Sequence, residues 1–138
     1  MLKLEIPKNV FKQMVKHARM QAPVEACGIL AGKDGKVAKL YQMTNADQGS
    51  DHFMMEPAEQ FAVARDIRAG GFEMLAIYHS HPETPARPSV EDVRLALTPG
   101  VINVIVSLQD SESSFIKSFI IEKCSSREVP VRILEEQK

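Results

Sequence analysis

The sequence IYHSHPETPARPSVEDVRLAL, residues 77–97, places two histidines one residue apart at the end of an apolar run. Side chains two positions apart on a strand point to the same side, so His79 and His81 share one face. Ser89 and Asp92 follow a proline-rich segment and lie one helical turn apart. Imidazole and carboxylate groups suit a zinc ion. The spacing is therefore compatible with His79, His81 and Asp92 converging on one metal ion.

Each part of this stretch also has a purely structural explanation. A His-x-His pair at a strand end is by itself a weak signal, and a single histidine in a loop is more often structural. A serine followed three residues later by an acid is typical of a helix capping box, which would explain Ser89 and Asp92 without a metal. The two explanations for Asp92 are compatible. Glu91 faces another direction on the helix, and the spacing of Glu83 and His52 gives no reason to prefer them as ligands.

A single glutamate interrupts the apolar residues 24–31, VEACGILA, which we expect to form a buried strand. Burial of an unpaired carboxylate is costly, so Glu25 taken alone is best explained as an edge-strand residue that faces water. The alternative is a general base beside a metal-charged pocket. Cys27 and Cys124 lie in apolar surroundings and are expected to be reduced and buried.

The spacing of apolar residues predicts helices and strands that are interleaved along the chain. His17 is expected on the polar side of the first helix, exposed to water. We predict an α/β (α+β) fold, a single domain of residues 1–138 with a mixed, mainly antiparallel sheet flanked by helices. The expected strands are residues 2–6, 24–31, 36–43, 74–78, 101–108, 115–122 and 129–134, and the expected helices are residues 8–20, 57–69 and 89–97.

The composition is ordinary for a soluble globular protein, with 44% hydrophobic and 25% charged residues. A net charge of −1 gives no electrostatic reason to expect nucleic acid or an anionic membrane as partner. We find no secretory signal and no apolar run long enough to cross a bilayer, so the cytoplasm is the expected location. The sequence leaves the oligomeric state open, with a homodimer as one option.

The residues taken together resemble the JAMM family (MPN-plus, Mov34/PAD-type) of zinc metalloproteases, in particular its short prokaryotic members. The family pattern is an upstream glutamate, then His-x-His, seven residues, Ser, two residues and Asp. Residues 82–88 supply the seven, and the match has no gap. The upstream glutamate of the family stands in Glu-x-Cys-Gly followed by two apolar residues, as in residues 25–30, EACGIL. Asn45, Phe53 and Pro57 also match positions of short bacterial members.

This resemblance implies a cytidine-deaminase-like MPN/JAMM fold and a zinc-dependent peptidase. By position, His79, His81 and Asp92 would hold one Zn²⁺ per chain. Glu25 would be the acid/base, and Ser89 would be the assisting hydroxyl. The substrate would be a ubiquitin-like or sulfur-carrier protein, cut at a peptide or isopeptide bond of its C-terminal tail.

Three other functions are weaker explanations. A catalytically silent MPN-type interaction scaffold with a structural zinc would have no need for Glu25. Zinc deaminases also combine a histidine ligand with a glutamate base, but this sequence lacks their Pro-Cys-x-x-Cys segment. A DNA-repair-associated relative of the same fold is disfavoured by the near-neutral charge. Whether residues 82–88 close over the site is left open.

Overall fold

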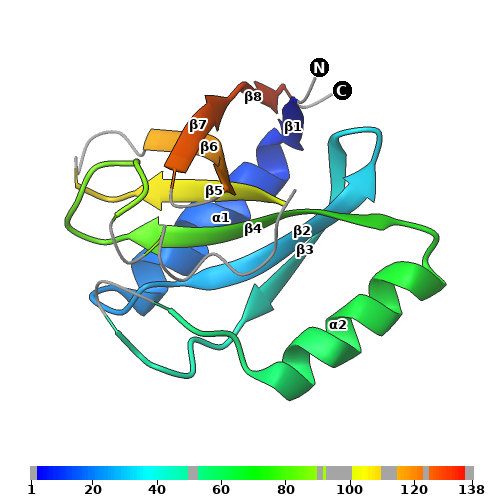
Figure 1. The fold of residues 1–138 in the computed structure, drawn as a ribbon, viewed down its shortest axis with the longest axis horizontal. Coiled ribbons are helices and arrows are strands. Elements are labelled where there is room, and N and C mark those ends of the chain that lie inside the picture. The colour runs from blue at the N-terminus through cyan, green and yellow to red at the C-terminus, as the bar shows by residue number, and fades with distance from the viewer. Residues whose placement is uncertain are drawn as a thin grey trace.

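The computed structural model describes residues 3–49, 53–89, 92, 101–109, 115–122 and 125–135. The expected helix of residues 89–97 lies outside them except for Ser89 and Asp92, as does Cys124. The elements are β1 (Leu4–Pro7), α1 (Lys8–Gln21), β2 (Cys27–Lys33), β3 (Lys36–Met43), α2 (Pro57–Ala69), β4 (Glu73–His81), β5 (Ile102–Ser107), β6 (Phe115–Glu122), β7 (Ser125–Val129) and β8 (Val131–Leu134) (Figure 1).

These strands form one eight-stranded sheet in the order β7-β6-β5-β4-β2-β3-β1-β8. The pairs β2–β3, β2–β4, β5–β6 and β6–β7 are antiparallel. The pairs β1–β3, β1–β8 and β4–β5 are parallel. The prediction of a mixed, mainly antiparallel sheet is confirmed. β4 lies in the middle of the sheet, where neighbours on both sides fix the strand that carries both candidate histidine ligands.

The strand expected over residues 129–134 is two strands, separated by Pro130. Proline has no N–H to donate to a ladder, so it interrupts regular pairing. β7 lies at one edge of the sheet and β8 at the other. Because a single residue joins them, the sheet must curl until its edges approach, and Figure 1 shows β7 and β8 next to each other.

The two helices α1 and α2, both within the described residues, pack on opposite faces of the sheet. α1 is amphipathic, and its Val10, Met14 and Ala18 join a core cluster with buried residues of seven strands, β1 to β7, among them Leu30 and Tyr78. Ile29 belongs instead to a second cluster with Ile67, the single buried residue of α2. We call these two sides of the sheet the α1 face and the α2 face.

His17 corrects one expectation, because it is buried in this core and not exposed to water. Its Nδ1 lies 2.8 Å from the hydroxyl oxygen of Tyr78 on β4. Burial lowers the pKa of His17 and raises the pKa of the Tyr78 hydroxyl. The pair is therefore neutral at neutral pH, and one hydrogen bond allows a polar residue on the buried side of α1.

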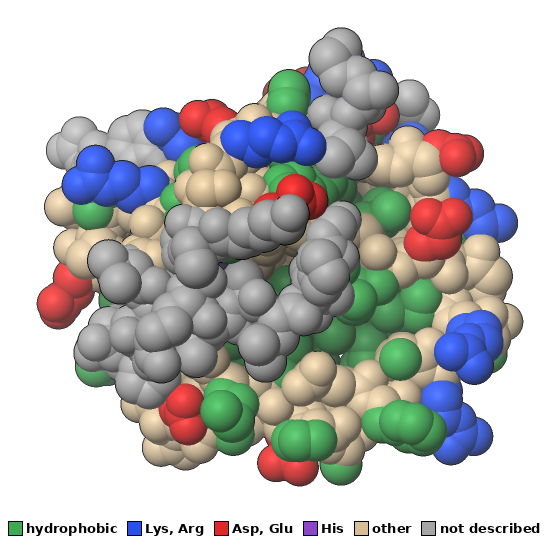
Figure 2. All heavy atoms as spheres, viewed as in Figure 1, with side chains coloured by type: hydrophobic (Ala, Val, Ile, Leu, Met, Phe, Trp, Pro, Cys, Tyr) green, Lys and Arg blue, Asp and Glu red, His purple; other side chains and the backbone are tan. Residues whose placement is uncertain are grey.

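An apolar hollow lies on the α2 face, lined by residues of α2 and of the neighbouring strands. Figure 2 shows hydrophobic side chains gathered there, and Ile29, Ile67, Phe72 and Met74 line the hollow. Phe61, which fits the helical spacing of this segment, is 70% exposed. Neither described helix is long and apolar enough to cross a membrane.

Candidate metal centre

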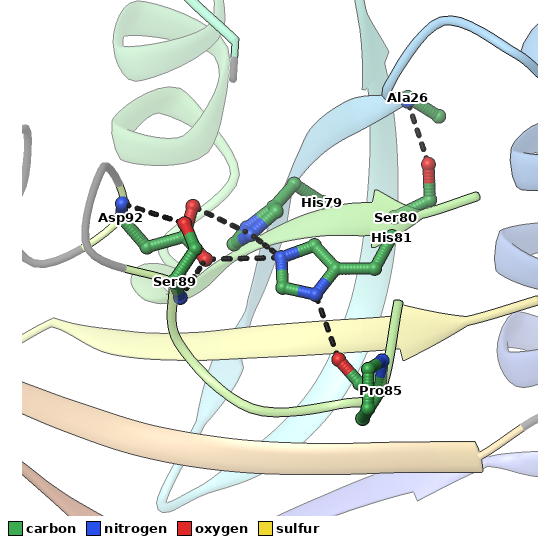
Figure 3. Close-up of polar contacts among 7 residues, drawn as sticks. All are labelled: Ala26, His79, Ser80, His81, Pro85, Ser89 and Asp92. Atoms are coloured by element: carbon green, nitrogen blue, oxygen red, sulfur yellow. Dashed lines mark hydrogen bonds and ion pairs between the residues drawn. The ribbon is translucent and has the colours of Figure 1, made fainter. Parts of the chain in front are cut away.

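His79 and His81 end β4 on the α2 face, since side chains alternate along a strand and Tyr78 points to the α1 face. Both rings are buried, with exposed fractions of 1% and 2%. Their Nε2 atoms lie 3.2 Å apart, and the rings are tilted against each other (Figure 3). The expected convergence of the two imidazoles is therefore present.

Asp92 completes the cluster from the segment that follows the proline-rich loop. Its Oδ1 lies 3.2 Å from His79 Nε2, and its Oδ2 lies 2.9 Å from His81 Nε2. The Asp92 side chain is also buried, at 3% exposed, and one possible ligand atom from each residue lies within 4.8 Å of the others. Glu83, the other acid described in this segment, is exposed and takes no part.

Ser89 and Asp92 also form a reciprocal capping box. The Ser89 N–H donates to Asp92 Oδ2 at 2.8 Å, and the Asp92 N–H donates to Ser89 Oγ at 3.0 Å. Asp92 can therefore form this capping box with Ser89 and face a metal ion with the same carboxylate position. Because Ser89 Oγ accepts this bond, its own proton remains available for another acceptor.

The proline-rich loop fixes the tautomer of His81. Its Nδ1 lies 2.8 Å from the carbonyl oxygen of Pro85, and a carbonyl can only accept. Nδ1 therefore carries the hydrogen, and the neutral ring directs the Nε2 lone pair into the cluster. A histidine ligand held from behind by a carbonyl is the usual arrangement in metal sites.

The ring of His79 is held by stacking. It lies 4.7 Å from the ring of Phe53, with 26° between the planes. Its buried Nδ1 has no hydrogen-bond partner among the described residues. Phe53 was noted in the sequence only for its position, and the contact with His79 shows what it does there.

The charges in the cluster favour a cation. Burial would raise the pKa of Asp92, but its close contacts with His79 and His81 and the hydrogen bond from the Ser89 N–H hold it well below its usual range. Burial lowers the pKa of His79. Burial would also lower the pKa of His81. The contacts with Asp92 and the Pro85 carbonyl and the charge of Glu25 outweigh burial, so the pKa of His81 is raised.

Two imidazole nitrogens and one ionised carboxylate, all buried and within hydrogen-bond distance of each other, fit zinc in type and number. Three protein ligands are also the number that catalytic zinc sites use, because a fourth position stays open. The donor set has too few oxygen atoms for calcium or magnesium.

Glu25 corrects the edge-strand explanation. β2 begins only at Cys27, and Glu25 precedes it with a side chain that is 2% exposed. The pairing of Cys27 with His79 brings Glu25 to the end of β4, where its charge acts on His81. Cys27 is not a competing nucleophile, because burial, with smaller effects from Glu59 and Glu25, raises the pKa of its thiol to about 12.

The structure therefore brings His79, His81, Asp92 and Ser89 together, with Glu25 at the same end of β4. His52 and Glu91 lie outside the described residues. Sequence reasoning missed the contribution of the Pro85 carbonyl, since every residue carries one and only the fold selects it.

Comparisons with known proteins agree with this geometry. The chain matches the model described as prokaryotic homologs of the JAB domain over residues 7–119. The CysO-cysteine peptidase of Mycobacterium tuberculosis is 36% identical over 135 residues, which are 96% of this chain and 92% of the relative.

Two solved structures are also similar. A solution structure from Desulfitobacterium hafniense has a TM-score of 0.89 at 42% identity and covers 96% of this chain and 94% of that one. A structure described as a JAMM metalloprotease-like zinc site in the proteasome and signalosome has a TM-score of 0.57 at 21% identity, covering 94% and 98%. At that identity the second likeness concerns the fold alone.

Proposed function

The chain belongs to the prokaryotic JAB family of JAMM-type zinc metallopeptidases, and we propose that it cleaves the C-terminal tail of a ubiquitin-like or sulfur-carrier protein. The observation that carries this proposal is the buried cluster of His79, His81 and Asp92 beside a buried Glu25. A relative named for its action on CysO-cysteine supports a carrier bearing an amino acid or peptide as the substrate.

We assign His79, His81 and Asp92 as the ligands of one zinc ion. The ion, when bound, supplies a Lewis acid that polarises the scissile carbonyl and lowers the pKa of a water molecule toward ~7. The protein holds the ligands in place before the ion arrives. Pro85 orients His81, Phe53 supports His79, and Ser89 fixes the carboxylate of Asp92.

Glu25 acts as the general base and then as the general acid. Its carboxylate accepts a proton from the attacking water as the oxygen–carbon bond forms. The same proton passes to the leaving amine as the carbon–nitrogen bond breaks, so Glu25 is regenerated. A buried position keeps competing water away from this carboxylate.

Ser89 donates its hydroxyl hydrogen to the oxyanion that develops on the substrate carbonyl. The bond from the Asp92 N–H to Ser89 Oγ holds the hydroxyl oxygen in place. A donor fixed in advance stabilises the developing charge without reorganising during the reaction. A catalytically silent scaffold would need neither this donor nor a buried Glu25.

A substrate panel tests the proposal. Zinc-loaded protein is incubated with diglycine-tailed carrier proteins that bear a C-terminal amino acid, a peptide or a lysine-linked peptide. We expect hydrolysis directly after the diglycine, lost with a chelator and restored by added zinc. Cleavage that survives the chelator would contradict the mechanism, and the preferred member of the panel identifies the bond.

A further inference from the structure

The β2–β4 ladder changes its form at Ser80, between the two histidines of the candidate metal site. The last regular pair is Cys27 with His79. In the next pair, the Ser80 N–H donates to the Ala26 carbonyl oxygen at 2.9 Å, as in an antiparallel ladder. The Ala26 N–H, however, donates to the side-chain Oγ of Ser80 at 2.8 Å (Figure 3). A hydroxyl thus takes the place of a strand carbonyl where the chain leaves the sheet toward Glu25.

Ser80 cannot take part in the reaction directly. It lies between two ligand histidines, and alternation along β4 turns its side chain to the α1 face. Ser80 and Ala26 are each 1% exposed. Without the hydroxyl, water has little access to the Ala26 N–H, and a buried donor without a partner is costly.

The other backbone groups of this segment are also bonded. The Glu25 N–H donates to the Gly49 carbonyl at 2.7 Å, and Asn45 Nδ2 donates to the Glu25 carbonyl at 3.0 Å. These two partners come from the loop that follows β3. Ser80 comes from the strand that carries the ligands, so it couples the position of Glu25 to that of His79 and His81.

We propose that Ser80 is a positioning residue, whose hydroxyl holds the Glu25–Ala26 peptide in register with the two histidine ligands. The inference rests on the proposed function, in which Glu25 moves the proton. Loss of the hydroxyl should let Glu25 shift while the ligands keep their places. We therefore expect loss of the Ser80 hydroxyl to slow the chemical step, with little change in substrate or zinc binding.

The first test compares three variants. Ser80→Ala should lower kcat by about 10- to 100-fold, the range expected for a misplaced catalytic group, with KM and zinc content close to wild type. Ser80→Thr keeps the hydroxyl and should recover most of the rate. Ser118→Ala is the matched control. Ser118 lies on β6, away from Glu25, but it is also fully buried, and its hydroxyl donates to the Val129 carbonyl oxygen at 2.7 Å.

A double variant separates positioning from general stability. Ser80→Ala added to Glu25→Gln should cost no further rate, because its effect passes through Glu25. An equal loss in both backgrounds would overturn the proposal, as would a loss no larger than that of Ser118→Ala. If Ser80→Ala fails to fold, Ser80→Cys keeps the size and offers a weaker acceptor; a full wild-type rate in Ser80→Cys would also overturn it.

Hydrogen exchange tests the contact without any turnover. The Ala26 amide should lose protection in Ser80→Ala and keep it in Ser80→Thr and Ser118→Ala. Unchanged protection in Ser80→Ala would overturn the inference even in an active enzyme. If the wild-type protein cleaved no carrier tail, the proposed function would fail, while the exchange result would still decide whether Ser80 holds Ala26.

Discussion

Two glutamates of this chain differ sharply in their surroundings. Glu25 is buried beside the end of β4, whereas Glu83 is exposed on the loop between His81 and Ser89. We expect Glu25→Gln to keep zinc and to lower kcat by roughly 10²- to 10⁴-fold, because general acid–base catalysis contributes about that much. His79→Ala should lose both zinc and turnover. Metal content per chain and the rate of tail cleavage measure the two effects.

Glu83→Gln is the control for Glu25→Gln, since it removes the same charge from an exposed position. It should retain zinc and most of the activity. An active Glu25→Gln enzyme would remove Glu25 from its assigned role. Loss of zinc from Glu25→Gln would instead make Glu25 part of the metal site.

Gly28 has a steric reason to be glycine. It pairs with Tyr78 across β2 and β4, and a Cβ at this position would lie 2.1 Å from Cε1 of that ring and 2.5 Å from the Tyr41 carbonyl oxygen. The backbone oxygen cannot turn away as a side chain can. Gly28→Ala should therefore lower the free energy of unfolding by about 1–3 kcal/mol or more, measured by denaturant titration.

Gly70→Ala is the matched control, because its added Cβ would meet chiefly the Phe72 ring edge, at 3.2 Å. We expect a clearly smaller loss there, since a ring edge on the surface can move. Equal losses in the two variants would mean that close approach to Tyr78 is not why residue 28 is glycine.

The sequence predicted the residues of the cluster better than their surroundings. The spacing of His79, His81 and Asp92 limits where they can point, because strand and helix periods are fixed. The burial of Glu25 could not be read from apolar neighbours alone, since a carboxylate there is equally consistent with an exposed edge. Only the pairing of Cys27 with His79 places it inside.

At the scale of elements, α1 and β4 are joined by the His17–Tyr78 hydrogen bond. Burial holds the pKa of His17 below its ordinary value of 6.5 in the folded chain. Below pH 6.5, His17 binds a proton in the unfolded chain but stays neutral in the folded chain. The contribution of His17 to the free energy of unfolding is therefore complete only above pH 6.5. It falls as the pH drops from 6.5 toward the folded pKa, by at most about 1.4 kcal/mol per pH unit.

The His17→Gln variant isolates this effect. Glutamine can still bond the Tyr78 hydroxyl but does not titrate. We expect the stability difference between wild type and variant to change between pH 7.5 and pH 5, with the wild type losing more. Comparing the two chains cancels the contributions of the other histidines. Parallel stability curves over this range would contradict the burial of a neutral His17.

The helices and most strands were predictable because their boundaries carry strong local signals. Pro57 begins α2, and Gly70 follows its last residue. The C-terminal strands were less predictable. Pro130 marked a break, but only the closing of the sheet decides that β7 pairs with β6 and β8 with β1. Such long-range pairing has no local signal.

At the scale of the whole molecule, the site joins parts of the chain that are distant in sequence. The strand β4 supplies two imidazoles, the segment of Ser89 supplies the carboxylate, and the segment before β2 supplies Glu25. An ion held by the two imidazoles and by Asp92 would connect the central strand β4 to the segment that follows the proline-rich loop. Metal binding and folding should therefore be coupled.

We expect zinc to raise the thermal stability of the protein. A ligand that binds only the folded state at about 100 times its Kd adds roughly 2.7 kcal/mol, which for a domain of this size raises Tm by on the order of 10 °C. Differential scanning calorimetry of the metal-free chain with and without zinc measures the shift. Magnesium should give no comparable shift, because two of the three proposed ligand atoms are imidazole nitrogens.

Three variants show whether this stabilisation comes from the cluster. His79→Ala and Asp92→Ala each remove one ligand and should abolish the shift, because two remaining ligands hold zinc weakly. Glu25→Gln should keep the shift, since in the proposed mechanism Glu25 moves protons and does not hold the ion. A zinc-dependent rise in Tm that survives His79→Ala would place the bound ion elsewhere, and neither the ligand set nor the peptidase mechanism would then stand.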